Sequence, residues 1–287
     1  MEQLNEIKET SNSYDGIDGT NVVLFGGAGT GKTYSIGTLV DTGVEVFCLM
    51  MESGLDSLKG YYTDRNLAIP NNLHWHKVAA RKAGFEAAIS SADKISKLDH
   101  KTLASSNDPR RGDFDQWHKM LTSLNNFIDD RTGISYGSVA DWKSDKTIVI
   151  DGLTGMGNAA MGLVVGGKPV RSQSDWGIAQ NQLENILRML CDDCPCHFVL
   201  IAHMEREIDQ VLGGIKLRVM SLGQALAPKI PTMFSDCIMA TRDGSTWYWD
   251  TANGQADLKT RNLPISSKIK PDFGQIISKW KSRNNLK

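Results

Sequence analysis

Apolar and polar positions alternate along the chain in blocks that predict strands and helices in turn. Continuous apolar runs too short for helices predict buried strands, and they lie at residues 21–25, 44–50, 147–150 and 197–202. Residues 72–78, NLHWHKV, are a further candidate for a short strand. Helical spacing occupies residues 32–41, 81–98 and 176–190, and an amphipathic helix is marked by Phe114, Trp117, Leu121, Leu124, Phe127 and Ile128. This alternation is typical of the α/β class, with a mostly parallel sheet flanked by helices.

The pattern changes after residue 230. Residues 245–261, STWYWDTANGQADLKTR, form two alternating runs around Asn253-Gly254, which predicts an antiparallel hairpin. We therefore expect a polar N-terminal segment at 1–20, an α/β core at 21–245, and a C-terminal hairpin with a basic tail at 246–287 that packs on or extends the core.

Composition narrows the function classes. The 287 residues carry a formal net charge of −1, which excludes a globally polycationic nucleic-acid binder. No apolar run approaches the ~20 residues of a membrane span, and the first 16 residues are too polar for a signal peptide. The 5 cysteines, an odd number without an export signal, indicate reduced thiols. We expect a cytoplasmic protein that does not bind membranes.

A glycine-rich segment follows the first predicted strand. Residues 26–33, GGAGTGKT, fit the P-loop pattern G-x-x-x-x-G-K-[ST] without a mismatch. Glycines let the backbone approach a ligand, and N–H groups at the next helix start form an anion cradle. Lys32 is placed to reach the β- and γ-phosphates, and the Thr33 hydroxyl to ligate Mg²⁺. We expect ATP to contact Gly26, Gly27, Ala28, Gly29, Thr30, Gly31, Lys32, Thr33 and Tyr34.

Three polar residues end or follow other predicted strands, at the edge where an open α/β sheet binds ligands. Asp151 ends the run KTIVID and is placed to hold Mg²⁺ through water beside Thr33. Glu52 follows the strand at 44–50, where it can orient or deprotonate the attacking water, or serve a helix N-terminus. His203 ends the run FVLIAH and either senses the γ-phosphate or is a satisfied edge histidine.

Together these features resemble the RecA-like P-loop ATPases, and within them the phage nucleotide-binding proteins of the Sak-four group, associated with single-strand annealing and recombination. The resemblance spans about residues 21–275 and is carried by GGAGTGKT, MESGLDSL, TIVIDGLTGM, SDWGIAQNQLENILRML, FVLIAHMERE, APKIPTMFSDCIMATR and LKTRNLP. One departure is Gly152, where RecA-type proteins often carry serine. The insert at 90–113, which includes the polar break SSNDPRRGD, has no counterpart that we assign.

The resemblance directs attention to loops after the two central strands as DNA contacts. The first candidate is the glycine-rich segment 155–174 with Lys168 and Arg171, read as a long loop; the second is 204–230 with Lys216 and Arg218, whose charge alone would not suggest DNA. Residues 258–287 add 8 basic residues against 1 acid, with Trp280 available to stack a base. A solvated basic tail is the alternative.

The resemblance also implies a basic pair that acts on the neighbouring subunit. In LKTR, Lys259 and Arg261 are two apart on the second arm of the predicted hairpin, so their side chains share a face. RecA-like ATPases use such a pair to reach the γ-phosphate that is bound to the neighbouring subunit. The resemblance implies that Arg261 is the arginine finger, the residue that contacts this phosphate, and that Lys259 assists it. A solvated strand edge is the alternative.

A cluster of thiols raises a separate metal question. The stretch CDDCPCH holds Cys191, Cys194, Cys196 and His197, ligand types that zinc favours. Structural zinc sites usually pair ligands from two separated knuckles, whereas these four crowd into one turn. Reduced thiols at a turn are therefore the alternative that we prefer.

The sequence thus predicts an ATP- and Mg²⁺-dependent ATPase that assembles on single-stranded DNA and promotes annealing or strand exchange. Its expected state is a homo-oligomer, either a ring or a filament, with a phage or host single-strand-binding protein as a candidate partner. A ring-type DNA motor, such as a helicase or a packaging ATPase, is the main alternative. A small-molecule kinase and a nucleotide-gated scaffold are further ones, although the kinase interpretation lacks an arginine-rich lid and Glu52 disfavours the scaffold.

Overall fold

One sheet organises the chain. The computed structural model describes residues 14, 16–79, 84–105, 114–168, 170–208 and 213–286. Among these residues eight strands form a sheet of order β3-β2-β4-β5-β1-β7-β8, with β6 paired to β5. The strands are β1 Asn21–Gly26, β2 Glu45–Met50, β3 Leu73–Lys77, β4 Lys146–Asp151, β5 His197–Ile208, β6 Ile215–Val219, β7 Asp236–Asp243 and β8 Thr246–Asp250.

Most of the strand pairs are parallel, as the sequence predicted. Strand β1 runs parallel to β5 and β7, β2 runs parallel to β3 and β4, and β4 runs parallel to β5. Only β5–β6 and β7–β8 are antiparallel among the strands described. The expected α/β fold, a mostly parallel sheet flanked by helices with an antiparallel hairpin toward the C-terminus, is confirmed.

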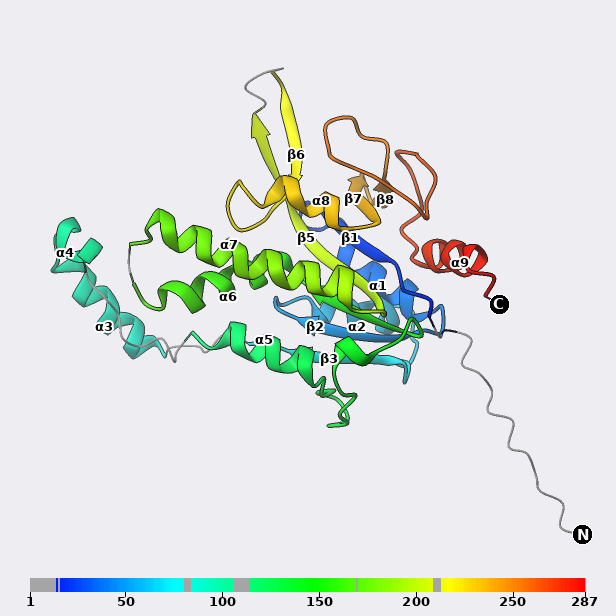
Figure 1. The fold of residues 1–287 in the computed structure, drawn as a ribbon, viewed down its shortest axis with the longest axis horizontal. Coiled ribbons are helices and arrows are strands. Elements are labelled where there is room, and N and C mark those ends of the chain that lie inside the picture. The colour runs from blue at the N-terminus through cyan, green and yellow to red at the C-terminus, as the bar shows by residue number, and fades with distance from the viewer. Residues whose placement is uncertain are drawn as a thin grey trace, which may run out of the picture.

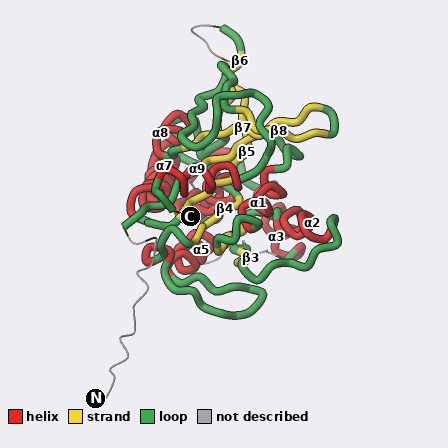
Figure 2. Tube along the Cα trace, turned by 90° about the vertical axis from the view of Figure 1, so that its right-hand side faces the viewer, coloured by secondary structure: helices red, strands yellow, loops and turns green. Residues whose placement is uncertain are grey.

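Helices cover both faces of the sheet. One apolar cluster joins the sheet to α1, α2 and α9, and a second joins the opposite face to α5, α6 and α7. In Figure 2 the strands lie between α7 on one side and α1 and α2 on the other. The described helices are α1 Lys32–Val40, α2 Leu55–Thr63, α3 Phe85–Ser96, α4 His100–Ser105, α5 Gln116–Asn125, α6 Leu153–Val165, α7 Gln173–Arg188, α8 Ile230–Met233 and α9 Gly274–Arg283.

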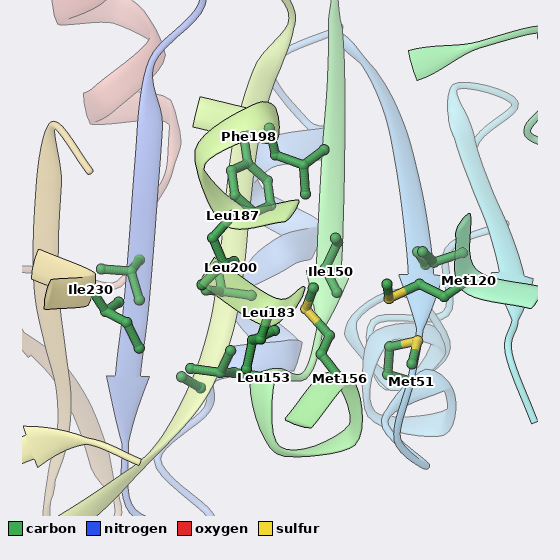
Figure 3. Close-up of a cluster of buried hydrophobic side chains, with 14 of the residues drawn as sticks. Met51, Met120, Ile150, Leu153, Met156, Leu183, Leu187, Phe198, Leu200 and Ile230 are labelled. Carbon is green, nitrogen blue, oxygen red and sulfur yellow. The ribbon is translucent and has the colours of Figure 1, made fainter. Parts of the chain in front are cut away.

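The core beneath α6 and α7 fixes where the ends of the central strands lie. Figure 3 shows Ile150 of β4 and Leu200 of β5 meeting Met156 of α6 and Leu183 of α7, all fully buried. Burying a side chain of this size contributes roughly 1.5–3 kcal/mol relative to exposure. The helices that follow β4 and precede β5 are therefore anchored to those strands.

The glycine-rich segment 155–174 is not the long loop that the sequence suggested. Helix α6 continues to Val165 and α7 begins at Gln173, so a short connection remains between them. The glycines serve close packing: a Cβ on Gly155 would lie 2.7 Å from the Met51 carbonyl oxygen, and one on Gly157 would lie 3.3 Å from Leu222 Cβ. Glycine in this helix permits close approach rather than chain reversal.

The predicted hairpin is present but shifted. Strand β8 pairs with β7 through a turn at Gly244, whose φ is 57°, and the predicted turn at Asn253-Gly254 is not its connection. Both Asp243-Gly244 and Asn253-Gly254 are turn signals that flank the same aromatic run. Pairing with β7 prevails because it adds β8 to the buried sheet. Beyond β8 the chain returns in irregular backbone, with isolated bridges from Lys259 to Cys237 and from Ile269 to Trp249.

Two other helices end or begin at residues different from those that the sequence predicted. Helix α5 stops at Asn125, whereas the apolar spacing continued through Phe127 and Ile128. Phe127 donates its N–H to the Gly137 carbonyl and Ile128 bridges Ser135, so these two residues belong to a short antiparallel ladder. The segment predicted as a helix from 81 contains α3 from Phe85, and residues 81–83 lie outside the described residues.

Two elements project from the body in Figure 1. One consists of α3 and α4, which overlap the insert at 90–113; residues 106–113 of that insert lie outside the described residues. Phe85, the first residue of α3, is 91% exposed. The other is the β5–β6 hairpin, which extends a core strand outward. In the described part of the chain, no helix has the length and apolar character to cross a membrane.

Candidate nucleotide-binding site

A cavity of about 670 Å³ lies at the carboxyl ends of the central strands. Its size falls in the range of small-molecule sites, and such edges of α/β sheets are where ligands bind. The cavity is lined by the P-loop from Ala28 to Tyr34, by the start of α2, and by Glu52, Asp151, His203 and Trp247. The structure therefore brings together the P-loop and the three polar residues that the sequence singled out.

The P-loop has the backbone that its glycines permit. Gly29 and Gly31 adopt φ values of 73° and 76°, which side-chain-bearing residues rarely tolerate. Lys32 begins α1 and curls back, so that Nζ donates to the Gly26 carbonyl at 3.0 Å and to the Gly27 carbonyl at 2.7 Å. The ammonium group of Lys32 is thus hydrogen-bonded to carbonyl groups of the P-loop itself. Burial lowers the pKa of Lys32, against the opposing effect of Asp151 and Glu52.

Thr33 and Asp151 form the centre of the site. Thr33 Oγ1 donates to Asp151 Oδ2 at 2.7 Å, and burial raises the pKa of Asp151, outweighing the hydrogen bond from Thr33 and the charge of Lys32. A Cβ on Gly54 would lie 2.5 Å from Asp151 Oδ2, so only glycine leaves room at the start of α2. A hydroxyl and a carboxylate side by side are hard oxygen donors that fit Mg²⁺, which takes few protein ligands and retains waters.

Glu52 is held in a defined orientation by two donors from different elements. The Gly155 N–H of α6 donates to Oε1 at 3.0 Å, and His203 Nε2 donates to Oε2 at 3.3 Å. A Cβ on Gly152 would lie 3.0 Å from Glu52 Oε1, so the glycine that departs from the RecA-type pattern leaves space for this carboxylate. A carboxylate fixed in this way can accept a proton from a water beside the phosphates.

Lys259 and Arg261 lie away from this cavity. Arg261 lines a second cavity of about 520 Å³ together with Asn21, Cys191 and Ser235, which lie at the amino ends of β1, β5 and β7. The chain's own P-loop lies at the opposite edge of the sheet. Arg261 is also not on a strand: it occupies a turn, so the expected shared face with Lys259 on a hairpin arm is wrong.

The turn that carries Arg261 is anchored by one buried carboxylate, Asp236. Asp236 Oδ1 accepts from the N–H of Arg261 at 2.8 Å, the N–H of Asn262 at 2.9 Å and the hydroxyl of Thr260 at 3.0 Å. Asn262 Nδ2 and Ser235 Oγ donate to Oδ2 at 2.7 and 3.0 Å. The backbone of the turn is therefore fixed to the start of β7.

Most of the candidate DNA contacts have partners within the protein. Lys168 pairs with Asp175 at 3.3 Å, Lys216 with Asp257 at 3.0 Å, and Arg218 with Glu207. The fourth, Arg171, lies over the Trp176 ring at 5.6 Å.

Trp280 cannot stack a nucleic-acid base as the basic tail suggested. Its side chain is 5% exposed, its indole N–H donates to the Asp18 carbonyl at 3.0 Å, and its ring packs against His197. Trp280 instead anchors α9 to the body. The sequence did not reveal this because the partners lie far away in the chain.

The thiol cluster contains no metal-ligand arrangement among the residues that the structure describes. All five cysteines are free. Burial raises the pKa of Cys191 and Cys196 to about 12 and that of Cys194 to about 11, so these thiols are protonated near neutral pH. His197 is buried and accepts from the Thr20 N–H at 2.9 Å, and burial lowers its pKa to about 4.

Sequence reasoning missed three contributors to the site. Gly54 and Gly155 act through the space or the N–H that they supply, and nothing local distinguishes them from packing glycines. Trp247 comes from β8, far along the chain, and its indole N–H donates to the Gly29 carbonyl at 3.1 Å. The alternating run TWYWD indicated an aromatic face here, but the strand pairing that aims the face at the P-loop is not local information.

The family is decided by a match that covers most of the chain. The profile of a family described as an AAA domain matches residues 18–262. The chain belongs to this family of P-loop ATPases. No protein of curated function matches the sequence of this AAA domain.

Two solved structures resemble this AAA domain distantly. One is an ATPase from the type III secretion system of pathogenic bacteria, with 12% identity, a TM-score of 0.36, and coverage of 80% of this chain and 55% of that chain. This chain thus spans about half of the secretion ATPase. The other is the RadB recombinase, with 10% identity, a TM-score of 0.37, and coverage of 83% and 84%. At these values neither similarity assigns a role to the chain.

Asp151→Asn should stabilise the ligand-free protein near pH 7 while removing its response to Mg²⁺ and ATP. Burial raises the folded pKa of Asp151 above the unfolded value, so its contribution to stability is fully present below the unfolded pKa and is lost as pH rises through the folded one. Each unit of the shift costs about 1.4 kcal/mol at neutral pH. An amide avoids this cost and still accepts the Thr33 hydroxyl, but it is a poorer Mg²⁺ ligand.

Thermal unfolding between pH 4.5 and 8, with and without Mg²⁺ and ATP, measures both effects. The gain in melting temperature should shrink toward low pH. Asp56→Asn, which neutralises an exposed carboxylate of the same cavity, is the control and should show neither effect. A lower melting temperature for Asp151→Asn at pH 7, or an unchanged response to Mg²⁺ and ATP, contradicts the assignment.

Proposed function

We propose that the chain is an ATP-hydrolysing, RecA-like protein that acts on single-stranded DNA in phage recombination or annealing, as the Sak-four resemblance suggests. The observation that carries the ATPase part is the convergence of three units in one cavity: the P-loop with Lys32, the Thr33–Asp151 pair, and Glu52 held by His203. Phosphoryl transfer to water requires these units together, because catalysis is mainly positioning and charge stabilisation.

Each residue has a defined part in this reaction. The P-loop N–H groups and Lys32 bind the phosphates, with Lys32 exchanging the carbonyls of Gly26 and Gly27 for phosphate oxygens. Thr33 and Asp151 would hold Mg²⁺, which when bound neutralises charge on the β- and γ-phosphates. Glu52 accepts the proton of the attacking water, while His203 and the Gly155 N–H keep its carboxylate oriented.

The DNA part of the proposal is supported by the resemblance and by the hairpin that leaves the site. Strand β5 carries His203 in the cavity and continues directly into the projecting β5–β6 hairpin. Because Lys168, Lys216 and Arg218 are paired with carboxylates, DNA phosphates would have to displace those acids. Because the proposed contacts join Lys and Arg to phosphates and not to bases, binding should be strongly salt-dependent and largely independent of sequence. A single-strand-binding protein of phage or host is the candidate partner, in the host cytoplasm if a phage encodes the chain.

The proposed active species is a homo-oligomer, a ring or a filament, in which Arg261 acts on the nucleotide of the neighbouring subunit and Lys259 assists. Two observations support this arrangement. Arg261 lies at the edge of the sheet opposite the chain's own P-loop, so it can reach only another subunit's phosphates. Its turn is held by Asp236, which supplies the rigidity that a transition-state contact needs.

Glu52→Gln should retain ATP binding and lose hydrolysis by about 10²–10⁴-fold, because general-base catalysis acts only in the transition state. Lys32→Ala should abolish tight ATP binding, because Lys32 contacts phosphate in the ground state. Equilibrium binding and steady-state ATPase assays separate the two. Glu45→Gln, at the opposite end of β2, is the matched control and should behave as the parent. Hydrolysis by Glu52→Gln at the parent rate would show that the base is wrongly assigned.

Replacing Lys168 and Arg171 together by alanine should weaken single-strand binding without changing ATP affinity in the absence of DNA. Each lost phosphate contact lowers the salt dependence of binding by about one unit of slope. Fluorescence anisotropy with a labelled single strand, at several salt concentrations with Mg²⁺ and ATP, measures this. The control replaces Lys94 near the end of α3 and Lys97 just after it, an equal change of charge. If the parent shows no binding at low salt, the DNA part of the proposal is wrong.

Arg261→Ala should bind ATP nearly as the parent does but hydrolyse it about 10³-fold more slowly or worse, as for other arginines supplied between subunits. Mixing it with the inactive Lys32→Ala protein should restore activity, because mixed interfaces pair an intact P-loop with an intact finger. Lys279→Ala, which removes an exposed cation from α9, a helix that also lines the second cavity, is the control. If ATPase activity is strictly proportional to protein concentration down to a dilution at which the protein is monomeric, and mixing restores no activity, Arg261 is a surface charge without a part in catalysis.

A further inference from the structure

The indole of Trp247 covers the P-loop, although Trp247 lies 218 residues beyond Gly29 in the chain. Its N–H donates to the Gly29 carbonyl at 3.1 Å. Its ring lies so close to Gly31 that a Cβ there would be 2.7 Å from Trp247 Cδ2, and it contacts the Tyr34 ring with centroids 5.2 Å apart. One side chain thus touches three residues of the phosphate-binding segment.

The direction of Trp247 is set by β8. Trp247 and Trp249 are two apart and leave the same face of the strand. Trp249 is 1% exposed and packs edge-on against Phe273 in the core, with centroids 4.8 Å apart. With Trp249 anchored, Trp247 projects from the same face beyond the buried part of the sheet, over the P-loop. Tyr248 leaves the opposite face, under Lys268.

We propose that Trp247 is a positioning residue of the phosphate site, which holds the Gly29–Thr30 peptide in the orientation that binds phosphate. The carbonyl and the N–H of a trans peptide point in opposite directions. An indole that binds the Gly29 carbonyl therefore holds the Thr30 N–H on the far side, where the N–H groups of the loop form the anion cradle. Glycines at 29 and 31 would otherwise leave this peptide free to rotate.

The packing of the ring supports the same role. Gly31 has a positive φ and its Cα faces the indole, so the ring closes the space into which the loop could otherwise relax. The phosphates are bound in both the ground state and the transition state. A defect in the cradle therefore changes nucleotide affinity and KM more than kcat, because it removes uniform binding. This role rests on nucleotide binding at the P-loop, and not on the DNA part of the proposed function.

Trp247→Phe and Trp247→Ala test the proposal. Phenylalanine retains most of the ring but lacks the donor, and alanine lacks both. Binding of ATP and of inorganic tripolyphosphate, which has no base, is measured by calorimetry with Mg²⁺, together with KM, kcat and the melting temperature. We expect Trp247→Phe to weaken binding of both probes by the same factor, about 3- to 10-fold, the value of one hydrogen bond. Trp247→Ala should weaken it further, with kcat within about twofold of the parent.

Tyr248→Phe, on the opposite face of β8, is the matched control and should leave all these quantities unchanged. Loss of affinity for ATP but not for tripolyphosphate would overturn the proposal and assign Trp247 to the base. A lower melting temperature with unchanged affinities would overturn it and leave Trp247 as packing. If the parent binds ATP without hydrolysing it, the proposed ATPase reaction fails, whereas the two binding measurements still decide the role of Trp247.

Discussion

The parallel register of β2, β4, β5 and β1 is the constraint on which the rest of the site depends. It pairs Met50 with Asp151, Asp151 with Ile201, and Gly26 with His203, so β2, β4 and β1 end close together beside residues 201–203 of β5. A slip of one residue would turn every side chain of a strand to the other face. The buried apolar side chains on both faces of the sheet oppose such a slip, so the core fixes the relative positions of the reacting groups.

Around this edge the site requires empty space as much as it requires polar groups. Gly54 admits the Asp151 carboxylate, Gly152 leaves room for Glu52, and Gly155 brings α6 close to the end of β2. A larger residue at any of these positions would separate groups that now lie within hydrogen-bonding distance. The same close approach lets the backbone of α6 supply a donor to Glu52.

Local patterns sufficed to predict the elements whose signals are local. Continuous apolar runs predicted strands β1, β2, β4 and β5, and the P-loop pattern predicted the turn between β1 and α1. The failures occur where distant partners decide the outcome. Gly155 and Gly157 lie in a helix that packs closely against Met51 and Leu222, and β8 pairs with the preceding strand β7 because β7 offers a buried edge. Trp280 is a core residue because α9 returns to the start of the chain.

The candidate functional residues also divide into those with local sequence signals and those whose surroundings depend on distant contacts. Lys32, Thr33, Glu52 and Asp151 lie at or after strand ends, and His203 lies where the apolar run of β5 ends. The sequence reveals these positions, and the residues converge. The sequence shows where the basic residues are but not which acids pair with them. The acids that pair with Lys168, Lys216 and Arg218 become their neighbours only after folding. The sequence gives no sign of whether a cation on the surface is already neutralised.

The buried carboxylate of Asp236 has a consequence for how the chain can be divided. It is the common acceptor for the start of β7 and for the turn at 260–262, and Asn262 also donates to the Thr20 hydroxyl at the start of β1. A shortened chain that stops before residue 246 would leave this carboxylate buried without most of its donors, at a cost of roughly 1–3 kcal/mol or more. The last segment of the chain is therefore a structural component of the ATPase core and cannot be removed as a flexible appendage.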